Sequence, residues 1–149
     1  MVEEKVLELV TEIFQSVGED VRIVKGRKFD GFYVDIQNLK EPAIFIGKNG
    51  IVLRSMQYIL NVYAHRLDQN FPTIILDVNG YKMDQFEMLK TIAINAALRA
   101  KRLKEPVELK PMSASARRII HITLKNYPDV WTRSIGKEPR RRVIVDVKK

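Results

Sequence analysis

Helical and strand-like hydrophobic patterns follow one another in a distinctive order along the N-terminal half of the chain. Apolar residues recur at helical spacing over residues 2–17, and alternating apolar positions then predict strands over residues 21–25 and 32–37. A short helical segment, a glycine loop and a longer helix come next, and a third strand follows over residues 74–78. The predicted order is helix, strand, strand, helix, helix, strand, which indicates an α+β fold.

The same pattern predicts which faces of these elements are buried. In the second strand Phe32, Val34 and Ile36 alternate with more polar residues, so we expect a hairpin with one buried face. The glycine-containing stretch over residues 26–31 is predicted to form its turn. One side of the longer helix is expected to face the core, and it consists of Val52, Met56, Ile59, Leu60, Tyr63 and Leu67.

The C-terminal half predicts a second small module. A helix over residues 82–104, with a narrow and alanine-rich apolar stripe, would be about 35 Å long at 1.5 Å per residue, enough to connect two small domains. The elements expected after it are a short strand, a helix and two strands, over residues 107–110, 113–125, 130–135 and 141–147. We therefore expect two α+β modules, over residues 1–80 and 81–149, joined by the long helix.

The basic residues are concentrated in the last third of the chain. Residues 1–98 hold 11 lysines and arginines against 13 aspartates and glutamates, whereas residues 99–149 hold 15 against 5, a net charge of +10. A strongly basic surface binds polyanions because it releases the counterions that are condensed on their phosphates. This asymmetry favours a nucleic acid as the partner, with an acidic protein or an anionic membrane surface as the alternatives.

The residue types that are missing exclude several functional classes. The chain has no cysteine, so disulfides, thiolate zinc sites and cysteine nucleophiles are excluded. The first residues do not show the pattern of a secretory signal, and no apolar run reaches the roughly 18 to 20 residues that span a bilayer. We therefore expect a cytoplasmic protein without an integral membrane segment.

A Gly-x-x-Gly loop, formed by Gly47, Lys48, Asn49 and Gly50, stands between two predicted helices. Glycines let a phosphate approach the backbone closely, amides at a helix start attract the anion, and Lys48 adds a positive charge. It is not a nucleotide-binding P-loop, because no glycine stands five residues before Gly47 and Asn49 replaces the magnesium-binding Ser or Thr. An isolated motif of this kind is more often an ordinary turn, but its position between paired helices favours phosphate binding.

A cationic arc is predicted on the helix over residues 113–125. At about 100° per residue, four of its residues fall on one side, opposite the apolar ones: Arg117, Arg118, His121 and Lys125. We expect that side to face solvent, where guanidinium groups bind phosphates and an imidazole binds a phosphate or lies against a base. The predicted final hairpin adds positive charge through Arg140, Arg141 and Arg142. Because like charges repel, this density favours an anionic ligand over a merely solvated face.

Two parts of the chain resemble known nucleic-acid-binding domains. The predicted order of elements in the first module, with its glycine loop between paired helices, resembles a type II KH domain. Arg117 and His121, together with the stretches over residues 126–130 and 136–143, resemble the domain named for its Arg-x-x-x-His pair, which is associated with single-stranded nucleic acids. The two modules in this order are similar to the C-terminal portion of the Jag family of bacterial RNA-binding proteins.

This resemblance implies a protein that binds single-stranded RNA, or single-stranded DNA, without a cofactor. The glycine loop would hold the sugar-phosphate backbone, and Arg117 and His121, aided by Arg118, Lys125 and the final arginines, would bind a second stretch of it. A small single-KH-domain protein is implied as a further partner. Members of the family often carry another N-terminal domain, which we expect this chain to lack.

Two other functional classes stay open from the residues alone. One is a protein-interaction adaptor whose basic face binds an acidic partner or an anionic membrane surface. The other is a nuclease in which His121 acts as a base. Only two histidines are present, His65 and His121, no carboxylates stand beside them at metal-ligand spacing, and cations alone indicate binding rather than cleavage. We therefore expect no metal site, no cofactor and no catalysis.

Overall fold

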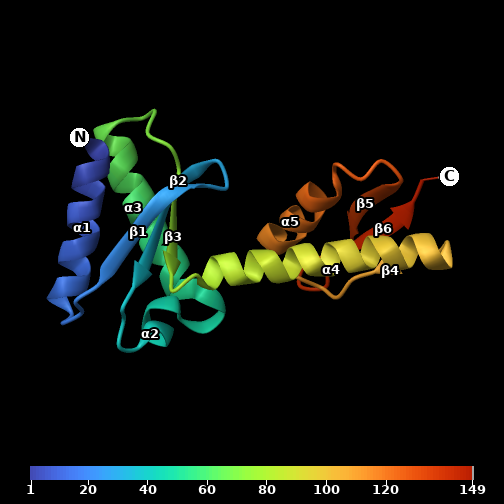
Figure 1. The fold of residues 1–149 in the computed structure, drawn as a ribbon, viewed down its shortest axis with the longest axis horizontal. Helices are drawn as coiled ribbons and strands as arrows, with labels where there is room; N and C mark the ends of the chain where they lie inside the picture. Colours follow the sequence, from blue (N-terminus) through green and yellow to red (C-terminus); the bar gives the residue numbers. More distant parts are fainter. Residues whose placement is uncertain (149) are drawn as a thin grey trace. The chain divides into compact units, whose positions relative to one another are not determined.

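The computed structural model describes residues 1–148 and divides into two compact units, Met1–Lys82 and Met83–Lys149. Each unit contains one three-stranded sheet (Figure 1). The elements of the first unit are α1 (Val2–Ser16), β1 (Arg22–Lys28), β2 (Gly31–Gln37), α2 (Pro42–Ile46), the 3₁₀ helix η1 (Lys48–Gly50), α3 (Ile51–Leu67) and β3 (Ile74–Val78). The long helix α4 (Tyr81–Leu103) follows, and β4 (Val107–Glu108), α5 (Ala114–Leu124), β5 (Val130–Ile135) and β6 (Arg142–Val147) complete the second unit.

In the first unit two helices, α1 and α3, pack against one face of a mixed sheet (Figure 1). The strand order is β1-β2-β3, in which β1 and β2 are antiparallel and β2 and β3 are parallel. Alternate residues of β2 and β3 point to the same face, where they meet the buried residues of the helices. These helical residues are Val6, Val10, Phe14, Leu53, Leu60 and Ala64. The predicted order of elements and the α+β class are confirmed.

The prediction of a hairpin with one buried face is wrong, because β2 is buried on both faces. On its second face Tyr33 Oη donates a hydrogen bond to Asp77 Oδ2 at 2.6 Å. Asp35 Oδ1 accepts one from the amide of Gly80 at 3.0 Å. Such partners allow polar side chains to be buried at positions that an alternating pattern assigns to solvent.

The turn between β1 and β2 also differs from the prediction. It lies at Phe29 and Asp30, both of which have positive φ angles, 56° and 59°. Positive φ at both central residues is favoured in two-residue hairpin turns because it matches the twist of the strands. Gly26, predicted to belong to the turn, lies within β1 and pairs with Tyr33.

The buried side of helix α3 matches the predicted one only in part: Met56, Leu60 and Tyr63 lie in or against the core. Its fully buried residues are Leu53, Leu60 and Ala64. Val52 and Ile59, which were predicted to face the core, are 36% and 58% exposed. The predicted stripe is therefore wrong except at its centre, and part of the apolar surface of α3 faces solvent.

The physical reason is that polar residues of α3 face the sheet. Asn61 Oδ1 accepts a hydrogen bond from the amide of Ile74 at 2.7 Å, and its Nδ2 donates to the carbonyl of the same residue at 2.9 Å. Gln57 Oε1 accepts one from the amide of Leu76 at 3.0 Å. Both side chains satisfy backbone groups of β3, the edge strand, so they take positions that hydrophobicity alone assigns to apolar residues.

The second unit packs α4 and α5 against one face of an antiparallel sheet with strand order β4-β6-β5. Val143 and Val145 of β6 lie at the centre of this core, together with Ile120 of α5. The buried residues of α4 are the small residues Ala93, Ala96, Ala97 and Ala100, which let the helix approach closely. The predicted long helix, the following helix and the three strands of this half are confirmed.

Candidate nucleic-acid interface

The glycine loop lies between α2 and α3 and exposes both residues between its glycines. Lys48 and Asn49 are exposed, and Lys48 forms no ion pair within residues 1–148. Gly47 has φ 74° and ψ 176°, a conformation essentially restricted to glycine, and a Cβ there would lie 2.5 Å from Val52 Cγ2. Gly50 follows with φ 77°. The glycines therefore fix a tight turn that presents two polar side chains to solvent.

Two cations that sequence reasoning missed lie beside this loop. Arg54 is exposed, and its Nη1 donates a hydrogen bond to the carbonyl of Asn49 at 2.6 Å. Lys82 is half-buried; its amide donates to Asp77 Oδ1 at 2.8 Å and its Nζ donates to Gln57 Oε1. Burial lowers the pKa of Lys82 to about 8, with Asp77 opposing and Arg54 adding to this effect. An arginine one helical turn after the loop was the sequence signal that could have identified Arg54.

Two of the four residues predicted on the cationic arc of α5 are exposed as expected. Arg118 and Lys125 face solvent, and neither forms an ion pair within the described chain. Helix α5 begins where it does because Ser113 Oγ accepts a hydrogen bond from the amide of Ala116 at 3.2 Å. The buried residues Ile120 and Leu124 fix the rotation of the helix and hence which side carries these cations.

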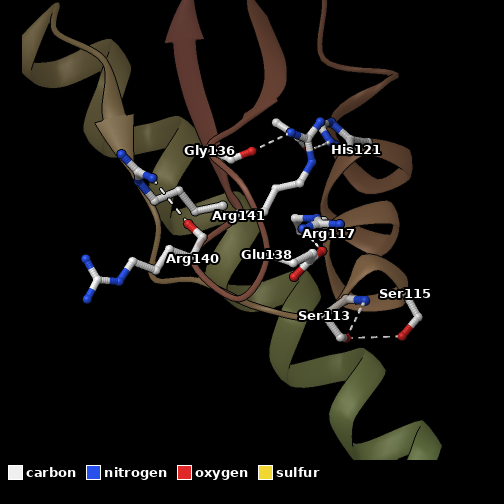
Figure 2. A network of polar contacts seen from close by, with 11 residues as sticks. Ser113, Ser115, Arg117, His121, Gly136, Glu138, Arg140 and Arg141 are labelled. Carbon is white, nitrogen blue, oxygen red and sulfur yellow. Dashed lines mark hydrogen bonds and ion pairs between the residues drawn. The ribbon is translucent and has the colours of Figure 1, made fainter.

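The prediction that Arg117 faces solvent is wrong. Its side chain is 9% exposed, and Nη1 donates to Glu138 Oε1 at 2.9 Å (Figure 2). On a helical wheel of α5, Arg117 lies next to the apolar residues. Glu138, from the loop between β5 and β6, lies against that side of the helix. Sequence reasoning did not pair Arg117 with Glu138, because this partner is 21 residues away in the chain.

The prediction of a solvent-facing imidazole at His121 is also wrong, because both ring nitrogens are engaged inside the unit. Nδ1 lies 2.6 Å from Thr132 Oγ1, and Nε2 lies 3.0 Å from Ser134 Oγ. Burial, and secondly the positive charge of Arg117, lowers the pKa of His121, so the ring is neutral at pH 7. A neutral ring held in this way joins α5 to β5. Two hydroxyl residues at core-facing positions of β5 were the signal for this contact.

The three arginines of the final hairpin have different environments. Arg140 is exposed and has no carboxylate partner in residues 1–148. Arg141 Nη1 donates to the carbonyl of Gly136 at 2.7 Å, which leaves its charge uncompensated (Figure 2). Arg142 instead forms an ion pair with Glu108. The run therefore supplies two cations to the surface rather than the predicted three.

The exposed groups of the two motifs are of the kinds that bind anions. Within residues 1–148 no three His, Asp or Glu side chains are grouped so that they could hold a metal ion. In the same range no helix combines the length and apolar character needed to cross a membrane. The exposed groups of the two motifs are cations, an amide and glycine backbone, all of which suit phosphates.

Comparison with known proteins assigns the second unit and the chain to families. The family of domains named for an Arg-x-x-x-His pair matches residues 87–146. A Clostridium symbiosum protein named RNA-binding protein KhpB is 34% identical over 149 residues, 99% of this chain and 67% of the relative. Proteins of the same name from Bacillus subtilis and Streptococcus pneumoniae are 26% and 30% identical; the alignments cover 87% and 85% of this chain and 62% and 39% of those proteins. This chain thus spans about two thirds or less of these relatives. It belongs to the KhpB family of RNA-binding proteins, also called the Jag family, and contains an Arg-x-x-x-His domain.

Proposed function

We propose that this chain binds single-stranded RNA through one surface on each unit, with the first unit acting as a type II KH domain. The loop surface consists of Gly47, Lys48, Asn49, Gly50 and Arg54. The basic surface consists of Arg118, Lys125, Lys137, Arg140 and Arg141. RNA is favoured over single-stranded DNA because the relatives carry RNA binding in their names.

The observation that carries this proposal is the uncompensated charge of the basic surface. None of its five cations forms an ion pair within residues 1–148, although four other cations of the chain do. Arg118 lies on α5, Lys125 directly follows it, and the other three lie on the loop between β5 and β6. The ion pair of Arg117 with Glu138 joins that loop to α5. Like charges gathered in this way repel one another, and a polyanion relieves the repulsion and releases counterions as it binds.

The motif residues of the two units have different proposed roles. At the loop surface, glycine backbone lets a phosphate approach, and Lys48 and Arg54 supply positive charge. In the second unit, Arg117 and His121 act as positioning residues. They hold the loop between β5 and β6, and β5 itself, against α5, so that the neighbouring exposed cations keep their places.

Fluorescence anisotropy of a labelled single-stranded RNA at several salt concentrations tests the proposal. Affinity is expected to fall with salt, with a log–log slope of about −0.7 for each phosphate that is neutralised. Replacing Lys48→Asp and Asn49→Asp together should weaken binding and flatten this slope. Replacing Lys5→Asp and Gln15→Asp on α1 makes the same change of charge at exposed positions outside the loop surface, so this variant is the matched control. Equal affinity of the two double variants would remove the loop surface from the proposal.

An apolar face of α3 supports a protein partner as a second function. Ile51, Tyr58, Ile59 and Val62 are 55%, 71%, 58% and 43% exposed. Exposed apolar patches of this kind mark protein interfaces more often than solvated surface. We propose that this face binds the small single-KH-domain protein implied by the family resemblance. Ile59→Asp should abolish that association in analytical ultracentrifugation; a complex that survives the substitution would exclude this face.

The proposed function needs no cofactor and includes no reaction, and the cytoplasm is its proposed location. Labelled RNA incubated with the protein and magnesium is expected to stay intact. Fragments that appear with the wild type and disappear with His121→Ala would instead show a nuclease.

A further inference from the structure

The sheet of the second unit has one face that neither α4 nor α5 covers. Both helices share a core with Val130 of β5, and alternate residues of a strand point to opposite faces. Trp131, Arg133 and Ile135 therefore lie on the face away from both helices. The residues of β6 that pair with these three, and the β4 residue that pairs with Ile144, lie on the same face. We call this the open face, and it consists of Trp131, Arg133, Ile135, Arg142, Ile144, Asp146 and Glu108. None of these residues is buried.

A tryptophan and an arginine are stacked on this open face. Cζ of Arg133 lies 5.4 Å from the centre of the Trp131 ring, a cation–π geometry. Arg133 is exposed and forms no ion pair within the described residues. An indole that stays partly exposed beside a guanidinium plane offers two flat groups on which unstacked nucleic-acid bases lie, because every base has a π-face.

The charges around this pair favour a nucleic acid over a protein as the occupant. Glu108 is neutralised by Arg142, so Arg133 and Asp146 are the remaining charges of the open face. The open face also runs directly into the basic surface. Ile135 and Arg142 pair at the end of the ladder, and the loop between them carries three cations of the basic surface, Lys137, Arg140 and Arg141. A strand whose bases lie on the sheet would therefore have cations beside its phosphates.

We propose that the open face is a base-stacking platform for single-stranded RNA, in which Trp131 and Arg133 hold an unstacked base and the basic surface holds the adjoining phosphates. This inference rests on the proposed function and adds to it the place where bases, rather than phosphates, are bound. It predicts binding energy that salt does not screen, because stacking is not a charge–charge interaction.

Intrinsic fluorescence tests the platform directly, because Trp131 is the single tryptophan of the chain. Single-stranded RNA should quench Trp131 emission at the same midpoint that anisotropy gives for labelled RNA. An abasic oligonucleotide of equal length keeps the phosphates but lacks the bases, so it should bind at low salt without quenching.

Substitutions at the platform give a second, independent readout. Trp131→Ala should weaken RNA binding roughly 5- to 150-fold, the range that stacking of one base supports. Trp131→Phe should retain most of the affinity, since a phenyl ring also stacks. Leu98→Ala, at a 58% exposed position of α4, is the matched control and should bind like the wild type. If Trp131→Ala alters the melting curve, Arg133→Gln replaces it, because that exposed side chain is removed without opening the core.

The outcomes separate the platform from the proposed function. RNA that saturates the anisotropy signal without changing Trp131 emission, together with wild-type affinity of Trp131→Ala and Arg133→Gln, would overturn the platform and leave RNA binding intact. Absence of any RNA binding would overturn both. Binding of an acidic protein to the open face in place of RNA would also overturn the platform.

Discussion

The two units present their motifs in opposite ways. In the first unit, Lys48 and Asn49 are exposed between two glycines. In the second unit, Arg117 is buried against Glu138, and His121 is hydrogen bonded to two hydroxyls of β5. Under the proposed function, the first motif supplies groups that meet the RNA, whereas the second supplies groups that hold a binding surface in place. Burial and internal partners, rather than residue type, distinguish the two cases.

The largest expected effect on stability comes from replacing Gly47, because the conformation of the glycine loop depends on the backbone of this residue. Gly47→Ala should destabilise the first unit by about 3 kcal/mol, because it combines a glycine-only conformation with a Cβ placed 2.5 Å from Val52 Cγ2. Gly50→Ala should cost only about 1 kcal/mol, since its Cβ would meet Tyr81 at an ordinary 3.5 Å and the strain is that of a left-handed residue. Hydrogen exchange of the β2 and α3 amides measures both. Equal protection in the two variants would show that Gly47 does not fix the loop.

The next effect concerns the buried guanidinium of the second unit. Arg117→Ala should destabilise that unit by about 2 kcal/mol, because it removes a buried side chain and its hydrogen bond to a carboxylate that is itself largely exposed. Arg118→Ala should change stability by less than about 0.5 kcal/mol and should weaken RNA binding instead. Urea unfolding, monitored by Trp131 fluorescence, measures the change in stability. Anisotropy of labelled RNA measures the change in RNA affinity.

The Arg117 and Arg118 pair decides whether the comparison between the units holds. If Arg117→Ala has the same free energy of unfolding as the wild type but no longer binds RNA, then Arg117 contacts the RNA and the two motifs act in the same way. Glu138→Gln sharpens the result, because it keeps a hydrogen-bond acceptor for Arg117 but removes the charge. The free energy of unfolding of Glu138→Gln should lie between those of the wild type and Arg117→Ala.

The sequence was sufficient for features that depend on local patterns. Helical spacing located α1, and the narrow, alanine-rich stripe containing Ala93 and Ala100 correctly predicted the long helix α4. The exposure of Arg118 agreed with its angle on the helical wheel. Each of these follows from residues within a few positions of one another.

The errors at α3 and α5 share a different cause, which is a partner far away in the chain. Asn61 faces β3 because it satisfies the backbone of Ile74, and this displaced the apolar side predicted for α3. Arg117 is buried because Glu138, in the loop between β5 and β6, packs against it and accepts its hydrogen bond. A helical wheel gives the angle of a residue but not the element that covers that angle. Polar residues at core-facing positions are the signal that such partners exist.

The smallest expected effect is a pH dependence of the second unit that originates at His121. Burial and Arg117 lower its pKa below the ordinary value of 6.5, so the unfolded chain takes up a proton more readily than the folded one. The contribution of His121 to stability is therefore complete above about pH 6.5 and is lost as the pH falls through the lower pKa of the folded state. His121→Gln keeps a hydrogen-bonding group of similar length but does not titrate, so its stability should fall less than that of the wild type over this interval. Urea unfolding of both proteins between pH 5 and pH 8, followed by Trp131 fluorescence, measures the difference. Parallel curves would mean that His121 titrates like a solvent-facing imidazole, and the internal role that separates this motif from the glycine loop would have to be abandoned.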